Sequence, residues 1–259
     1  MQRSVLYTVL FATAICIVCA VVVSSSAVSL KEQQMENATL DKQKNVLYAA
    51  GLLDPQEKVT AAEVEERFES VEMKVIDLET GQDNHDIDPL IFDQKKEAMR
   101  PDFSHLAPDN PSRIKRIPNH ALVYEMRDSE GELEGVVLPI EGYGLWGTLY
   151  GFLALEEDLN TVLGITYYDH KETPGLGGEV DNPKWKAKWP GRIAFGVNGD
   201  PELVVIKGPA GPATSDPHEV DGLSGATITS RGVTNMIHFW LGENGFQPYL
   251  QHLANEETS

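Results

Sequence analysis

The hydroxyl of Thr227 stands in a context that would suit a phosphate group. The small residues Ser224-Gly225-Ala226 precede it and leave the hydroxyl sterically open, and an apolar period that predicts a helix follows. A phosphate there would meet unpaired N–H groups and the positive end of the helix dipole. The same stretch could simply cap the helix, since Ser224, Thr227 or Thr229 would each serve as an N-cap. The local sequence alone favours an N-cap over a phosphate site.

A glycine-rich stretch from His170 to Gly178 follows a predicted strand. Its three glycines and Pro174 would expose backbone N–H groups and let a flat ligand approach the main chain closely. An ordinary structural turn fits the stretch equally well. His170 and Glu172 could contribute to a metal site, but no third ligand stands at a useful spacing, so we expect no metal there.

Residues 142 to 147 spell G-x-G-x-x-G after a predicted strand. A dinucleotide-binding fingerprint must open a helix, whereas residues 148 to 152 are aromatic, broken by glycine and strand-like. We therefore expect a tight turn and no dinucleotide site. The local pattern favours Trp146 as a core residue over a cofactor contact.

Two further patterns suggest metals only superficially. The acidic run at 83 to 88 fails the EF-hand pattern, because His85 and Ile87 occupy ligand positions and the sixth position lacks glycine. We expect a solvated acidic loop.

Cys16 and Cys19 spell C-x-x-C and could share an iron–sulfur cluster with a partner, but within their apolar run they are more simply two small side chains facing lipid. The chain has no other cysteine, which excludes a disulfide scaffold or a zinc fold in the soluble part.

An apolar run near the amino terminus predicts a membrane anchor. Residues 5 to 23 are 19 residues without a charge, and a rise of about 1.5 Å per residue brings their helix close to the roughly 30 Å hydrocarbon core. A signal peptide is the alternative, with Arg3 and Ser25-Ser26-Ala27 as its flanks, but its apolar region runs only about 7 to 15 residues. We expect an uncleaved anchor with the domain outside the cytoplasm, although the lysines at 31, 42 and 44 outnumber Arg3.

Helices are expected on both sides of a strand-rich part. Apolar spacing predicts one over residues 30 to 50. Thr60 and Glu63 form a T-x-x-E capping box for the next helix, whose apolar face is Val64, Phe68 and Val71. The last helix should run from about Thr229 to Leu241, with Gly242 as its stop.

The strand-rich part predicts an α+β fold. Residues 77 to 119 are rich in Asp, Pro and Asn and indicate a long loop or a loosely packed insertion. Short β-prone runs follow at 121–127, 135–140, 148–155, 161–168 and 203–207, the first two as a hairpin. Strands gathered between helices, without regular alternation, favour α+β. We divide the chain into an anchor at 1–27, a helical and acidic-loop region at 28–120, and a ligand-binding domain at 121–259.

The charge balance limits the partners. Forty acidic against 21 basic residues give a net charge of −19, which would repel nucleic acid phosphates and anionic lipid head groups. We therefore expect no nucleic-acid partner. The charge instead favours a soluble, exposed domain.

As a whole the chain resembles the C subunit of the Na⁺-translocating NADH:quinone oxidoreductase and, more distantly, the G subunit of Rnf-type complexes. The motif that carries the resemblance is Asp221-x-x-Ser224-Gly225-Ala226-Thr227, similar to the family signature D-x-x-[ST]-G-A-T. It is joined in the same order by residues 172–177 (E-T-P-G-L-G), residues 144–147 (G-L-W-G) and a single amino-terminal span. The resemblance covers nearly the full length.

The resemblance implies that Thr227 bears FMN through its phosphate, in a covalent FMN-binding domain at 121–259. It further implies that a flavin transferase attaches the FMN, taken from FAD, and that the chain relays electrons towards quinone without being catalytic alone. The cofactor-binding residues it suggests, apart from Thr227, are Asp221, Ser224, Gly225, Ala226, Glu172, Thr173, Leu176, Gly177 and Trp146, with Lys207 as a further candidate.

The implied setting is the bacterial inner membrane. There the chain would be one of six subunits, crossing the lipid once through residues 5–23 and holding its domain in the periplasm. The alternative is the Rnf G subunit, which serves ferredoxin and NAD. A flavin-binding sensor usually carries further spans or a signalling domain, and we find no such feature in the sequence. A stand-alone reductase needs its own acid–base residues, and we find no such set of residues either.

Overall fold

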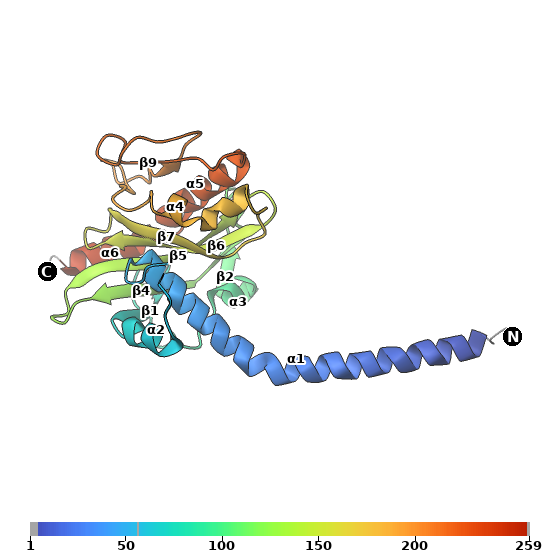
Figure 1. Ribbon diagram of the computed structural model, residues 1–259. Helices are drawn as coiled ribbons and strands as arrows, with labels where there is room; N and C mark the ends of the chain where they lie inside the picture. The colour runs from blue at the N-terminus through green and yellow to red at the C-terminus, as the bar shows by residue number, and fades with distance from the viewer. Residues whose placement is uncertain (1–4, 56, 258–259) are drawn as a thin grey trace. The chain divides into compact units, whose positions relative to one another are not determined.

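The computed structural model describes residues 5–55 and 57–257 of the chain, which divide into two compact units, Met1–Lys42 and Gln43–Ser259 (Figure 1). The first unit consists of most of helix α1 (Val5–Ala49). α1 is continuous where the sequence predicted a span and a separate second helix, because no glycine or proline interrupts the chain before Gly51. Arg3, which the signal-peptide alternative used, lies outside the described residues.

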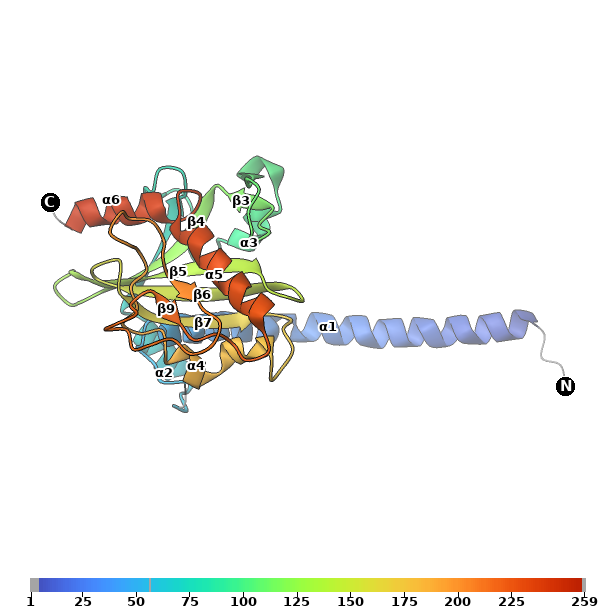
Figure 2. The same cartoon turned by 90° about the horizontal axis from the view of Figure 1, so that it is seen from above.

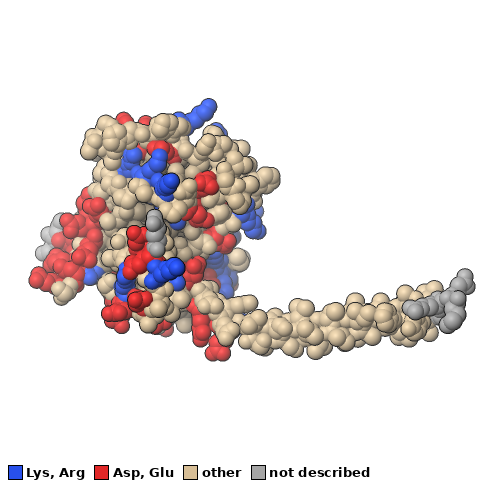
Figure 3. All heavy atoms as spheres, viewed as in Figure 1, with Lys and Arg blue, Asp and Glu red and all other residues tan. Residues whose placement is uncertain are grey.

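α1 contains a stretch long and apolar enough to cross a membrane. Its most apolar window has a mean hydropathy of 2.7, a property that a signal sequence can share. Cys16 and Cys19 lie exposed on this helix. In Figure 3 the outer part of the helix carries no coloured spheres of Asp, Glu, Lys or Arg. An apolar, uncharged surface of this kind is expected of a segment solvated by lipid.

The second unit is built on one five-stranded antiparallel sheet in the order β1-β4-β5-β6-β7. The strands are β1 (Val71–Asp77), β4 (His120–Arg127), β5 (Leu133–Tyr143), β6 (Thr148–Glu156) and β7 (Val162–Asp169). The last four were predicted, and β4 and β5 form the predicted hairpin. β1 pairs with β4 along its whole length, from Val71 with Met126 to Asp77 with His120.

Both faces of the sheet are covered. α5 (Thr227–Leu241) and α6 (Gln247–Glu257) lie over one face (Figures 1 and 2). There Val233, Ile237 and Trp240 of α5 join the main core. On the other face Phe68 of α2 (Ala61–Phe68) packs edge-on against Tyr124 of β4. The sheet is therefore the centre of the unit, and the β5–β6 turn and the loop after β7 extend from it.

The start of α2 confirms the predicted capping box. The Thr60 side chain accepts a hydrogen bond from the Glu63 N–H, and Glu63 accepts one from the Thr60 N–H. The prediction that Val71 belongs to this helical face is wrong, since α2 ends at Phe68 and Val71 opens β1. Pairing with β4 outweighs the local helical period there.

Residues 78–119 form an ordered insertion between β1 and β4. It contains α3 (Gln94–Ala98), the 3-10 turn η1 (Pro101–Phe103) and a small sheet of β2 (Ser104–Leu106) and β3 (Arg116–Pro118). Of the two predicted alternatives the segment is an insertion and not a long loop, but it is not loosely packed, because Ile114 and Ile117 belong to the main core. The acidic run at 83–88, within the insertion, also makes a structural contact, since Asp83 lies 3.5 Å from the Lys74 ammonium.

Short elements lie between β7 and α5. They are η2 (Gly177–Asp181), α4 (Pro183–Lys186) and a parallel pair of β8 (Val204–Val205) with β9 (Glu219–Val220). α5 and Gly242 at its carboxyl end match the predicted last helix, whereas α6 was not predicted. The α+β class is confirmed.

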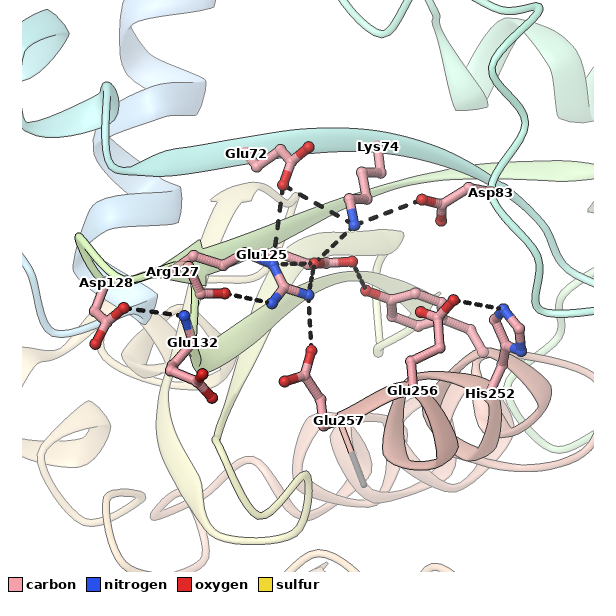
Figure 4. Close-up of polar contacts among 12 residues, drawn as sticks. Glu72, Lys74, Asp83, Glu125, Arg127, Asp128, Glu132, His252, Glu256 and Glu257 are labelled. Atoms are coloured by element: carbon pink, nitrogen blue, oxygen red, sulfur yellow. Dashed lines mark hydrogen bonds and ion pairs between the residues drawn. The ribbon is translucent and has the colours of Figure 1, made fainter. Parts of the chain in front are cut away.

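A buried carboxylate ties β4 to β1 and α6 (Figure 4). Glu125, 1% exposed, accepts hydrogen bonds from Lys74 at 2.9 Å, Arg127 at 2.7 Å and the Tyr249 hydroxyl at 2.9 Å. Arg127 in turn bonds Glu257 at 2.9 Å. Burial alone would raise the pKa of Glu125, but these hydrogen bonds and charges outweigh it and lower the pKa below its usual value.

Candidate functional site

Thr227 is the first residue of α5, and its side chain is exposed. The N-cap is Ala226, whose side chain can accept no hydrogen bond. The helix closes its first bond from the Ser230 N–H to the Ala226 carbonyl at 2.9 Å. Within the described part of the chain no hydrogen bond engages the Thr227 hydroxyl. The capping interpretation of Thr227 is therefore wrong, and its hydroxyl is available for chemistry.

The other two hydroxyl candidates for the cap are placed differently. Ser224 is exposed on the loop before the helix, whereas Thr229 is buried and donates to the Glu172 carboxylate at 2.6 Å. Ser230, also buried, accepts from the Leu223 N–H at 3.0 Å. Buried hydroxyls thus hold the helix start in place, and the hydroxyls at 224 and 227 face solvent.

Asp221 anchors the loop that leads to Thr227. Its carboxylate pairs with Lys188 and accepts from the Ala210 N–H at 3.1 Å, and its carbonyl accepts from the Trp185 indole at 2.8 Å. Burial would raise the pKa of Asp221, but the bonds from Lys188 and Ala210 outweigh it and lower the pKa. The next residue, Gly222, lies so close to the Ile206 carbonyl that a β-carbon would come within 2.2 Å of that oxygen.

Glu172 is buried and joins three segments. Its Oε1 accepts from the N–H groups of Leu145 at 3.0 Å and Trp146 at 2.9 Å, and its Oε2 accepts from Thr229. Leu145 and Trp146 lie in the β5–β6 turn, which Gly144 closes by donating its N–H to the Gly147 carbonyl at 2.8 Å. The G-x-G-x-x-G stretch is therefore a tight turn, as predicted, and this turn joins β5 to β6.

Glycines make room for this carboxylate. A β-carbon at Gly177 would lie 2.4 Å from Oε2 of Glu172, and one at Gly144 would lie 2.7 Å from Oε1. Gly225, with φ +72°, would bring a β-carbon within 2.9 Å of the Leu176 side chain. The glycine-rich loop and the Thr227 motif are thus in direct contact, which the sequence could not show.

Four exposed apolar side chains surround these loops: Leu145, Trp146, Leu176 and Ile228. Trp146 is 63% exposed, so the expectation that it is a core residue is wrong. Its backbone is fixed by Glu172 while its indole faces solvent. The four residues come from the β5–β6 turn, the glycine-rich loop and the first turn of α5. We call them the apolar platform.

The remaining candidate site residues do not belong to the apolar platform. Thr173 is exposed, and its carbonyl accepts from the N–H groups of Leu176 at 3.1 Å and Gly178 at 2.9 Å, which shapes the loop. Lys207 is exposed just after β8, on the segment against which Gly222 packs. His170 shapes the same loop, with its Nε2 2.7 Å from Asp181 and the Glu172 N–H 3.2 Å from its Nδ1. Within the described residues no cluster of three metal-ligating side chains occurs.

Comparison with known proteins decides the family. The FMN-binding domain family matches residues 144–242. The C subunit of the Na(+)-translocating NADH-quinone reductase of Pseudomonas aeruginosa is 46% identical over 99% of this chain and 99% of its own, and that of Yersinia pestis is 46% identical over 94% and 91%. The chain belongs to this C subunit family. Relatives of this kind do not favour the alternative of an Rnf G subunit.

Solved structures of the family share the fold. The crystal structure of the C subunit from Shewanella oneidensis superposes with a TM-score of 0.76 at 36% identity, covering 84% of this chain and 99% of that one. The structure from Parabacteroides distasonis gives 0.64 at 26% identity, covering 86% and 96%. The FMN-binding match begins at the β5–β6 turn and ends at Gly242. It therefore contains the apolar platform, Glu172 and Thr227.

Proposed function

We propose that this chain is the electron-transfer subunit of a Na⁺-translocating NADH:quinone reductase and carries FMN through a phosphoester bond to Thr227. One observation carries the proposal: the Thr227 hydroxyl is exposed and unbonded at the first position of a 15-residue helix. Family membership supplies the cofactor class. The residues at the site determine where the FMN would be held.

The start of α5 suits a phosphate chemically. The first N–H groups of a helix have no partner within it, and they carry the positive end of its dipole. Because Ala226 provides no side-chain cap, nothing from the cap residue competes for these N–H groups. A phosphate esterified at Thr227 would lie beside them, as anions at helix starts commonly do.

The apolar platform suits the flat ring of a flavin. Trp146 and Leu176 present exposed apolar surface next to the loop that bears Thr227. The glycines of both loops permit a close approach of a planar group to the main chain. The ring, when bound, supplies the reversible uptake of electrons, and the protein supplies its position and electrostatic surroundings.

Attachment requires a separate flavin transferase, with FAD as the donor of the FMN group. The Thr227 oxygen would form a bond to the phosphorus on the flavin side, the bond from that phosphorus to AMP would break, and the hydroxyl proton would leave. Thr227 is consumed once in this step. It is then a tether, and the electron transfer belongs to the flavin.

The remaining setting follows the family. We infer that residues 5–23 of α1 cross the lipid, with the amino terminus in the cytoplasm and the flavin-bearing domain in the periplasm. The chain would be one of six subunits and would pass electrons between its neighbours towards quinone. The apolar window of α1 supports the span.

Replacement of the hydroxyl tests the proposal. Full-length protein coexpressed with a flavin transferase should keep yellow fluorescence after denaturation and gel electrophoresis. Thr227→Ala should lose it, while Thr214→Ala, which removes an exposed threonine hydroxyl outside the motif, should keep it. Equal covalent flavin in Thr227→Ala would contradict the proposal.

A further inference from the structure

Outside α1, most of the exposed large apolar side chains fall in two groups. One is the apolar platform. The other lies in the insertion between β1 and β4, where Ile91 is 82% and Leu106 74% exposed. We define the insertion surface as Leu90, Ile91, Met99, Phe103 and Leu106. Exposed apolar residues gathered in this way commonly mark interaction sites.

The part of the insertion that carries these apolar residues differs in charge from the rest of the chain. Residues 89–118 contain six basic and four acidic residues, a net charge of +2 in a chain of −19. Lys96, Arg100, Arg113 and Lys115 are exposed. In Figure 3 basic side chains gather where Figure 1 labels α3 and β2. The apolar surface therefore has a basic rim.

The rest of the domain holds this surface firmly. Arg116 of β3 donates to the Ser104 hydroxyl at 2.8 Å, which joins both strands of the small sheet. Lys95 of α3 lies 3.5 Å from Asp169 and 3.3 Å from the ring centre of Tyr150, which fastens α3 to β6 and β7. The exposed apolar residues are thus presented by an ordered segment, which lowers the entropy cost of docking.

We propose that the insertion surface docks onto another subunit of the same reductase, at a patch with apolar residues in its centre and acidic residues at its rim. This rests on the proposed function, because it requires assembly into a complex. A partner protein fits better than lipid, because α3 has only five residues and is too short for an amphipathic helix that lies in a membrane surface.

Oxidation of Met99 by hydroxyl radicals tests the docking directly. Met99 is 76% exposed and should react freely in the full-length subunit held alone in nanodiscs of neutral lipid. In the purified complex its oxidation should fall about tenfold or more, as expected where water is excluded from an interface centre. Equal reactivity in both samples would overturn the proposal. Protection of the lone subunit in phosphatidylglycerol nanodiscs, with none added by the complex, would also overturn it in favour of lipid.

Charge substitutions provide a second measurement. Leu106→Glu and Arg100→Glu should each weaken retention of the chain by about tenfold when the complex is purified through a tag on another subunit. Val197→Glu is the matched control, because Val197 is fully exposed and belongs to neither apolar group. Flavin fluorescence of the same variants after denaturing gel electrophoresis reports the covalent tether separately. Full flavin with unchanged retention in both variants would overturn the docking surface alone.

Discussion

The Thr229 hydroxyl donates to Oε2 of Glu172 at 2.6 Å, inside the protein and across 57 residues of sequence. The other oxygen of the same carboxylate holds the β5–β6 turn. Thr229 is two residues beyond Thr227, so this contact sets the position of the α5 start relative to the apolar platform. Glu172 is therefore a buried residue that holds the two loops and the helix start together.

Removal of the Thr229 hydroxyl from its hydrogen bond with Glu172 should destabilise the domain. Thr229→Val keeps the shape but leaves Oε2 of Glu172 without its donor, and loss of a buried hydrogen bond to a charged group costs about 1.5 to 3 kcal/mol. Urea unfolding of the detergent-solubilised full chain should show this loss. Thr229→Ser should restore most of it, and Thr173→Val, at an exposed threonine, should have little effect. Equal stability of Thr229→Val and the wild type would contradict the role of Glu172.

A second prediction concerns the space around that carboxylate. In Gly177→Ala the added β-carbon would lie 2.4 Å from Oε2 of Glu172, so the loop must shift or the bond to Thr229 must break. We expect a loss of about 1 to 3 kcal/mol from overpacking, with the tether to Thr227 intact. Gly178→Ala is the control, because its nearest contact would be a milder 3.0 Å. A fully stable Gly177→Ala protein would show that the loop adapts freely.

Leu176 should tune the flavin without holding it. Leu176→Ala removes apolar surface beside Gly225, which exposes the ring to water and favours its charged reduced form. The potential should rise, by about 30 mV for a change of about 1.4 kcal/mol in a two-electron couple. Spectroelectrochemistry of the flavinylated chain measures it, with Val197→Ala as the control. An unchanged potential in Leu176→Ala would remove the glycine-rich loop from the ring site.

The Glu125 network predicts a specific acid sensitivity. Because the pKa of Glu125 is lowered in the folded protein, its ionised form contributes stability above its unfolded value of 4.5, and this contribution is lost as the pH falls through the lower folded pKa. At pH 7, Glu125→Gln should be less stable than wild type by about 3 to 5 kcal/mol, since Lys74 and Arg127 lose their buried partner. The difference should shrink once the pH drops below the folded pKa. A difference independent of pH would show that Glu125 does not titrate in this way.

The sequence predicted the local features well. The capping box of α2, the β4–β5 hairpin and the exposed hydroxyl of Thr227 depend on residues within a few positions of each other. β1 was missed because its first residue, Val71, continues the helical spacing of Val64 and Phe68. Only its pairing with β4, more than 40 residues later, decides the strand.

The site was predicted as a set of residues and not as a geometry. Glu172 was expected beside the cofactor, but its partners Trp146 and Thr229 lie 26 and 57 residues away and could not be inferred from spacing. Asp221 likewise bonds Lys188, 33 residues away, and faces the protein. The signal that could have revealed Glu172 is the coincidence of glycines at 144 and 177, which leave room for one carboxylate.

Peptide mapping of the native protein tests the covalent tether most directly. The full-length chain, purified from membranes of cells that contain a flavin transferase, would be digested and its peptides sequenced by tandem mass spectrometry. We predict that the peptide with residues 221–230 carries the mass of FMN less one water and that fragmentation places it on Thr227. An unmodified peptide at full coverage, or FMN mapped to Ser224 or Thr229, would contradict the account.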